Sequence, residues 1–258
     1  MTRREFMATG SLAGLAPLQS MAQPHPVGEA QFLELRHYLS PYGDGRKRLL
    51  DFFDRVAIPA WNRLDVGPVG VFSVLYGPNN SSVYVLLPHK SLASVLDAEN
   101  HMLSDSAFLK AGEAFYSLPS KDPGYRRIET SLLKCFSHMP QIHVPNTAAS
   151  RLFEWRIYES HHELKAKKKI EMFNEGGEID LFQKCGFVPV FFAETLIGPN
   201  RPNLNYMLVF SDMTERDKTW AVFRNHPDWL ALKEKPEYAD TVCTITDIIL
   251  QPVNFSQI

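Results

Sequence analysis

The chain has 258 residues, of which 45% are hydrophobic and 22% are charged, and its formal net charge is −2. Such a composition is typical of a folded globular protein, and the length suits two small domains or one larger core. The densest basic run, residues 165–169, falls in a helical pattern and is typical of a solvated helix face. The sequence therefore argues against a nucleic-acid-binding protein, and no nucleic-acid partner is expected.

Residues 1–22 are typical of an export signal. The pair Arg3 and Arg4, followed by a spacer, a Phe and an apolar residue, resembles the twin-arginine motif, although a chance arginine pair is the alternative. The uncharged stretch that follows is too short to span a bilayer stably, and its small residues predict cleavage after Ala22. Residues 23–30 then form a tether, and we expect a periplasmic or otherwise extracytoplasmic protein with no stable membrane span after cleavage.

The three cysteines do not form a disulfide framework. Their number is odd and no CxxC is present, so at most one disulfide can form. We expect Cys135, Cys185 and Cys243 to be small buried apolar residues, and the sequence leaves open whether two of them form a disulfide.

The strongest pattern in the sequence is an internal repeat. The segment Leu33–Tyr38 returns 120 residues later as Phe153–Tyr158, with Glu, Arg and Tyr at the same spacing. A Gly-Pro-Asn turn and a downstream tyrosine also recur, at offsets of 121 and 122 residues: 77–79 with 198–200, and Tyr84 with Tyr206. A duplicated unit of roughly 110–120 residues determines much of the architecture.

Both units are predicted to follow the order β-α-β-β-α-β. In the first unit, residues 31–137, the expected elements are strands at 31–38, 69–76, 82–87 and 128–136 and helices at 46–64, kinked or ended at Pro59, and at 91–114, broken near Ser104. After a linker at 138–150, the second unit, residues 151–258, has expected strands at 152–158, 188–197, 205–210 and 241–250 and helices at 161–183, interrupted at Gly176 and Gly177, and at 214–225, with a further turn after Pro227.

This order is the ferredoxin-like, split βαβ arrangement. Each four-stranded sheet has one face covered by its own helices, and the other face is left bare unless the two sheets cover each other. We therefore predict an α+β fold in which two tandem ferredoxin-like units pack sheet to sheet as a pseudo-dimeric α/β barrel. The Leu and Trp side chains of the first strands suit the helix side, which assigns the Glu, Arg and Tyr side chains to the barrel lumen.

The sequence resembles the NIPSNAP family. The resemblance rests on the Glu-x-Arg-x-Tyr strand that opens each half, on the Gly-Pro-Asn hairpin, and on a helical segment of the second half: Arg216, Trp220, Phe223, Arg224 and Asn225–Trp229. It covers nearly the whole mature chain and is stronger in the second half, from Phe153 to about Lys233. In the first half, residues 86–90 lack the Trp/Tyr-Asp sequence pattern that is usual in the family after the third strand.

The resemblance implies a dimeric α/β barrel fold and little about chemistry, because the activity of the family is poorly defined. The wider barrel superfamily includes cofactor-free monooxygenases, enzymes that degrade small molecules, and haem enzymes. Transferring any of these reactions would rest on fold analogy alone.

The candidate ligand-binding residues are mostly polar side chains that share one face of a strand. They are Glu34, Arg36, Tyr38, Tyr84, Glu154, Arg156, Tyr158, Tyr206 and His226. In the barrel lumen they would suit an anionic or phenolic ligand, because Arg can bind a carboxylate with two hydrogen bonds and a desolvated Glu can act as a base. The alternative is that each Glu pairs with an Arg across the sheets and only fixes the structure.

The histidines do not predict a metal or haem site. No HExxH, no CxxCH and no metal-ligand spacing is present, so we expect no metal and no tightly bound cofactor. His37 shares a face with Leu33 and Leu35, which favours a hydrogen-bonded core histidine. His226, before Pro227, suits either a helix end or the mouth of the barrel.

Three functions remain open. The first is an exported protein that binds a small organic ligand in a partly polar lumen, with or without acting on it. The second is a protein–protein interaction module with a filled barrel and its function on the outer helices. The third and most remote is a haem- or metal-dependent enzyme. The sequence suits either a monomer with a fused barrel or a homodimer.

Overall fold

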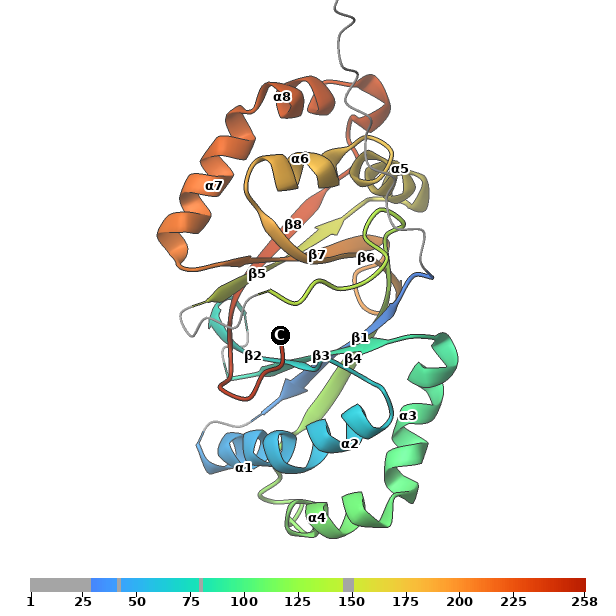
Figure 1. Ribbon diagram of the computed structural model, residues 1–258, viewed down its shortest axis with the longest axis vertical. Helices are drawn as coiled ribbons and strands as arrows, with labels where there is room; N and C mark the ends of the chain where they lie inside the picture. The colour runs from blue at the N-terminus through green and yellow to red at the C-terminus, as the bar shows by residue number, and fades with distance from the viewer. Residues whose placement is uncertain (1–28, 41–42, 79–80, 146–150) are drawn as a thin grey trace, which may run out of the picture.

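The computed structural model describes residues 29–40, 43–78, 81–145 and 151–258 (Figure 1). The expected signal segment, most of the tether and the end of the linker lie outside the described residues. The first half contains β1 (Phe32–Leu39), α1 (Asp44–Phe52), η1 (Phe53–Ala57), α2 (Ile58–Arg63), β2 (Gly70–Tyr76), β3 (Val83–His89), α3 (Leu92–Ser104), α4 (Ser106–Tyr116) and β4 (Arg127–Cys135). The second half contains β5 (Leu152–Glu159), α5 (Glu163–Phe173), α6 (Glu178–Lys184), β6 (Val188–Ile197), β7 (Asn203–Phe210), α7 (Met213–Asn225), α8 (Pro227–Lys233), η2 (Pro236–Tyr238) and β8 (Thr244–Pro252).

The helix breaks at Asp105 and Gly177 fall where local chemistry requires them. Pro59 does not end its helix: α1, η1 and α2 follow one another without a gap, and the π-helical turn η1 lies directly before the segment that contains Pro59. Asp105 ends α3 and caps α4, because its carboxylate accepts from the backbone N–H groups of Ala107 and Phe108. Gly177 separates α5 from α6 at a φ of +83°, a conformation that disfavours side chains with a Cβ.

The eight strands form one closed barrel in the order β1-β3-β2-β8-β5-β7-β6-β4. Each half contributes four neighbouring strands, and the halves join where β2 pairs with β8 and where β4 pairs with β6. Figure 1 shows the helices of the two halves on opposite outer sides, with the strands between them. The predicted fold of two tandem ferredoxin-like units is therefore confirmed, and closure of the barrel leaves no unpaired sheet edge.

The barrel lumen is mostly apolar, and the predicted assignment of faces is wrong. Its core draws side chains from all eight strands, among them Leu33, Leu35, Phe153 and Trp155, which were expected on the helix side. The Glu, Arg and Tyr side chains of the first strands lie instead between each sheet and its helices. The outer helices supply donors to the buried carboxylates, as Arg216 and Trp220 of α7 do for Glu154.

Tyr84 and Tyr206, matched in the sequence repeat, lie on opposite faces. Tyr84 is paired with His37 in the lumen, whereas Tyr206 is paired with Arg156 on the helix side. In the first half, the residue of β3 that pairs with Arg36 across the strands is Val85. The sequence match of Tyr84 with Tyr206 was therefore wrong by one residue, since Val85 is the structural counterpart of Tyr206. A shift of one residue along a strand moves a side chain to the opposite face of the sheet.

The three cysteines differ in their exposure. Cys135 and Cys185 are buried, but Cys243 is exposed, which corrects the expectation that all three are buried; all three are free thiols.

Within the described residues, no helix combines the length and apolar character needed to cross a membrane.

Candidate functional site

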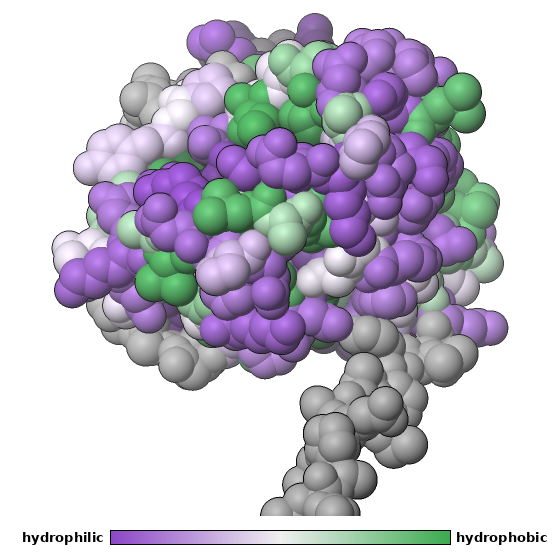
Figure 2. All heavy atoms as spheres, turned by 90° about the horizontal axis from the view of Figure 1, so that it is seen from above, coloured by the Kyte–Doolittle hydropathy of each residue, from purple (hydrophilic) through white to green (hydrophobic). Residues whose placement is uncertain are grey.

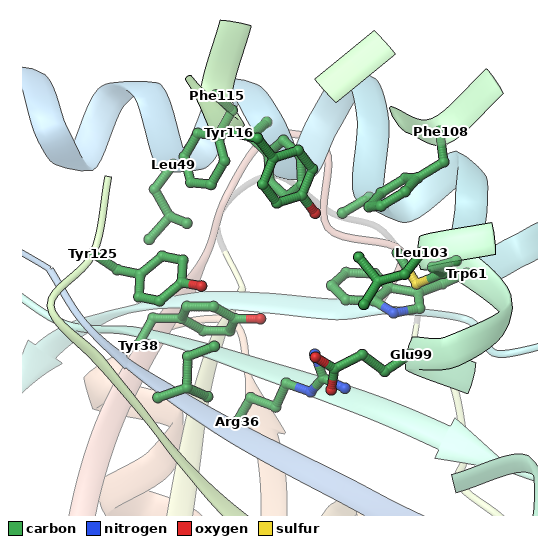
Figure 3. A pocket seen from close by; sticks show the side chains of 14 residues that line it. Arg36, Tyr38, Leu49, Trp61, Glu99, Leu103, Phe108, Phe115, Tyr116 and Tyr125 are labelled. Carbon is green, nitrogen blue, oxygen red and sulfur yellow. The ribbon is translucent and has the colours of Figure 1, made fainter. Parts of the chain in front are cut away.

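A cavity of about 130 Å³ lies in the first half, between the outer face of the sheet and the helices that cover it (Figure 3). Two positions of β1 form its floor, Arg36 and Tyr38, and α1 to α4 form most of its walls. The remaining lining residues are mostly apolar or aromatic: Leu49, Phe52, Ala57, Trp61, Glu99, Met102, Leu103, Phe108, Phe115, Tyr116, Tyr125 and Ile128. Such a lining, with few polar groups, is characteristic of sites for small organic molecules.

The charged floor of the cavity is internally paired. Arg36 donates from Nε and Nη2 to the two carboxylate oxygens of Glu34, at 2.6 and 3.1 Å. His89 Nε2 lies 3.4 Å from the same carboxylate. Burial alone would raise the pKa of Glu34, but the hydrogen bond with His89 and the charge of Arg36 outweigh burial and lower that pKa. Glu34 is therefore a carboxylate held by its partners and is poorly suited to act as a base at neutral pH.

Three phenols line this cavity, those of Tyr38, Tyr116 and Tyr125 (Figure 3). Burial raises the pKa of Tyr38, and it raises the pKa of Tyr116 to about 12. Both side chains therefore remain neutral near pH 7. Tyr38 lies edge-on to the ring of Tyr125, with ring centroids 5.3 Å apart. The cavity thus offers neutral hydroxyl groups set among aromatic rings.

Trp61 contributes a buried donor without an acceptor. The residue is 2% exposed, and its indole Nε1–H has no hydrogen-bond partner among the described residues. The guanidinium of Arg36 lies 5.7 Å from the centre of the indole ring. Figure 3 shows the indole nitrogen on the ring edge that faces Arg36 and Glu99. An unsatisfied N–H in a buried site is uncommon and requires an explanation.

At the positions that correspond in the repeat, the second half carries large buried side chains. At offsets of 120 or 121 residues, the positions of Leu49, Ala57 and Glu99 are occupied by Lys169, Glu178 and Trp220. Lys169 Nζ donates to Glu178 Oε2 at 2.7 Å, and both residues are buried. The Trp220 indole packs against Phe182 and Phe187. The cavity of the first half therefore arises because smaller or more exposed side chains stand where the second half places an ion pair and an indole.

The Glu-Arg-Tyr face of the second half is fully engaged in structural contacts. Glu154 is completely buried and accepts from Arg216 Nη2 at 2.5 Å and from Trp220 Nε1 at 2.6 Å. Arg156 stacks on the Trp220 ring at 4.4 Å and pairs with Asp247 at 2.7 Å. The alternative of structural pairing therefore describes this half, although Glu154 is held by a helix rather than across the sheets.

The tyrosines of this face complete the same packed layer. Tyr206 donates to the Tyr158 hydroxyl at 2.8 Å. Burial raises the pKa of Tyr158 to about 12 and raises the pKa of Tyr206 well above its usual value. Both phenols are therefore neutral at pH 7.

The remaining candidates are dispersed. Tyr84 lies in the lumen, stacked on His37 at 4.4 Å, and His37 Nδ1 lies 2.9 Å from Glu129, as expected of a hydrogen-bonded core histidine. His226 caps α8 by accepting from the backbone N–H of Asp228 and does not line the barrel mouth. Of the nine sequence candidates, only Arg36 and Tyr38 line the cavity.

The helical walls of the cavity were missed by sequence reasoning. Trp61 and Tyr116 lie in segments where aromatic residues at helical spacing normally indicate core packing. The sequence signal that could have indicated the cavity is the difference between the two repeats, because the first repeat has the small Ala57 where the second has Glu178.

Among the residues that the structure describes, no group of three or more His, Cys, Asp or Glu side chains is placed to hold a metal ion.

Comparisons with known proteins agree with this fold. A candidate monooxygenase from Fusobacterium nucleatum is 9% identical, with a TM-score of 0.58 over 87% of this chain and 93% of its own. A candidate monooxygenase from Lactobacillus acidophilus is 10% identical, with a TM-score of 0.55 over 87% of this chain and 94% of its own. At these identities the likeness concerns the fold alone.

NIPSNAP proteins are also among the matches. A NIPSNAP-like domain protein from Burkholderia xenovorans is 21% identical over 42% of this chain and 90% of its own, with a TM-score of 0.39. No curated protein matches the sequence. The NIPSNAP family model matches residues 153–257, which include the Glu-x-Arg-x-Tyr strand β5 and the capped helices α7 and α8. The second half of the barrel, residues 153–257, is therefore a NIPSNAP domain.

Proposed function

We propose that this protein binds a small organic molecule in the cavity of its first half. The observation that carries the proposal is the contrast between the two repeats: one half carries the buried side chains of Lys169, Glu178 and Trp220 at the corresponding positions, and the other leaves a cavity open. A concave site lined by apolar and aromatic side chains with a few polar groups is the usual setting for small-molecule binding. The unpartnered N–H of Trp61, which lines the cavity, supports a polar contact with an occupant.

The outer helices of the second half give less support to a docking function. Figure 2 views the molecule from the side of these helices, and hydrophilic residues dominate this face. Its apolar residues form separate groups among them. Docking sites on proteins are usually larger continuous apolar patches, so the ligand-binding proposal is preferred for this protein.

Substituting Leu103 by Trp should abolish binding in the cavity. Leu103 lines the cavity and is 49% exposed, so a larger ring can enter the opening without overfilling the core. The matched control is Leu96→Trp, seven residues earlier on the same helix, 68% exposed and outside the lining. Binding of ethylbenzene, acetophenone and benzoate would be measured by ligand-observed NMR on the mature protein.

We expect at least one of these three compounds to bind the wild-type protein and the Leu96→Trp variant with a Kd of about 1 mM or tighter. The Leu103→Trp variant should lose this binding while keeping its thermal transition. If none of the compounds binds the wild type, or if Leu103→Trp leaves the affinity unchanged, the cavity is not the binding site.

We also propose that the protein is exported through its N-terminal signal. The support is the Arg3-Arg4 motif with its uncharged continuation to Ala22. Replacing both arginines by Lys keeps the charge but removes the motif. We expect the double variant to stay in the cytoplasm with residues 1–22 attached, as measured by cell fractionation and intact mass. Export and cleavage at the wild-type level would contradict the proposal.

A further inference from the structure

We propose that the cavity takes a neutral, single-ring aromatic molecule that carries a hydrogen-bond acceptor, such as an aryl ketone, rather than an aromatic carboxylate. This inference rests on the proposed function, because it names the class of ligand for the same cavity. It is argued from the size of the cavity, the unpartnered indole donor of Trp61 and the charges that line the cavity.

The size and walls of the cavity suit one aromatic ring. Its volume of about 130 Å³ is close to the roughly 150 Å³ of an engineered apolar cavity that binds benzene. Phe108, Phe115 and Tyr116 line it from α4, and Trp61 lines it from α2. Aromatic rings prefer stacked or edge-on contacts with one another, so a planar ligand fits these walls better than a branched aliphatic one.

The donor without a partner calls for an acceptor on the ligand. Both halves place an indole over the Glu-x-Arg face, but only one indole has its acceptor. Trp220 donates to Glu154 at 2.6 Å, whereas the Glu34 carboxylate accepts from Nε and Nη2 of Arg36. The Trp61 N–H has no partner among the described residues, and Trp61 lines the cavity. A ligand oxygen within its reach would satisfy a donor that is otherwise costly to bury.

The charges around the cavity favour a neutral ligand. Arg36 is the one cationic side chain among the lining residues, and Glu34 already matches its charge with two hydrogen bonds. Glu99, which is exposed, adds a carboxylate at the wall. A ligand carboxylate would have to compete with Glu34 for Arg36 and would be repelled by Glu99. A carbonyl oxygen accepts a hydrogen bond without bringing a charge into the site.

The test compares three ligands of similar size in the mature wild-type protein at pH 7. Acetophenone has a ring and a neutral acceptor, ethylbenzene has the ring alone, and benzoate has a charged acceptor. We expect acetophenone to bind about tenfold more tightly than either of the other two. Substituting Trp61 by Phe keeps a ring at this position but removes the donor, so the acetophenone-to-ethylbenzene affinity ratio should fall about fivefold.

The outcomes separate this inference from the proposed function. Equal binding of acetophenone and ethylbenzene would overturn the role of the Trp61 donor, and tightest binding of benzoate would overturn the charge argument. In both cases the cavity would still be a ligand site. Loss of all binding, or binding that is indifferent to Leu103→Trp, would instead reject the cavity itself. The wild-type ranking decides the question even where the Trp61→Phe variant is poorly folded.

Discussion

Substituting Lys169 by Met is expected to lower the free energy of unfolding by about 3–5 kcal/mol. Lys169 Nζ lies 2.7 Å from Glu178 Oε2, and the two side chains are 5% and 2% exposed. The ammonium also lies 4.6 Å from the ring centre of Phe173 and 5.7 Å from that of Trp229. Removing Lys169 leaves a carboxyl group buried among aromatic rings with its cationic partner gone. Urea denaturation of the variant and the wild type measures the loss.

Two further variants identify the cause of this loss. Lys169→Met combined with Glu178→Leu should recover most of the stability, because replacing both members of a buried ion pair by apolar residues is often close to neutral. Lys168→Met is the matched control on the same helix, since Lys168 pairs with the exposed Glu171, and its stability should not change measurably. If the double variant is as unstable as Lys169→Met, packing of the lysine stem rather than the charge is responsible.

The stability of the Lys169→Met variant should also depend on pH. Burial raises the pKa of Glu178 even in the wild type, and it outweighs the attraction of Lys169. A carboxyl whose pKa is higher in the folded state than in the unfolded chain binds its proton more tightly when folded. The stability that the protonated Glu178 carboxyl contributes is therefore fully present below about pH 4.3, and it is lost as the pH rises through the pKa of the folded state. The variant should lose more stability at pH 8 than at pH 5.

Replacing Glu154 by Gln is expected to cost about 3 kcal/mol or more of unfolding free energy. The carboxylate is completely buried and receives hydrogen bonds from Arg216 and from the indole of Trp220, and Arg156 Nη1 lies 3.6 Å away. Gln keeps the shape of the side chain but removes the charge that balances two guanidinium groups.

The control for this prediction is Glu194→Gln. Glu194 accepts from Lys167, which is largely exposed, so loss of its charge should change stability by less than about 1 kcal/mol. Thermal and urea unfolding of both variants would be compared. Equal small effects would show that Arg156 and Arg216 are satisfied without Glu154, and that the layer between the second sheet and its helices is held by its aromatic residues.

Local sequence features determined the order of the elements and most of their limits. The break near Ser104 and the interruption at Gly177 both follow from residues that act on the backbone within one or two turns. The repeat then determined the architecture, because a sheet with one uncovered face requires a second sheet. For these reasons the predicted α+β barrel was correct before any contact was known.

Only the tertiary structure decided which face of each strand lies inside the barrel. The alternation in β1 shows that Glu34, Arg36 and Tyr38 share one face, but both faces of this strand are covered, so hydrophobicity alone cannot orient it. The answer depends on which side offers donors to a buried carboxylate, and those donors come from distant segments of the chain. Arg216 reaches Glu154 across 62 residues of sequence.

The cavity likewise belongs to the tertiary structure. It depends on the difference in volume between Ala57 and Glu178 and between Glu99 and Trp220, at positions that three helices bring over one strand. Sequence periodicity assigns each of these residues to a helix face, but it carries no information on how completely the faces of separate helices fill the space between them. Side-chain packing in three dimensions decides that, and in the first half the side chains at these positions leave the cavity open.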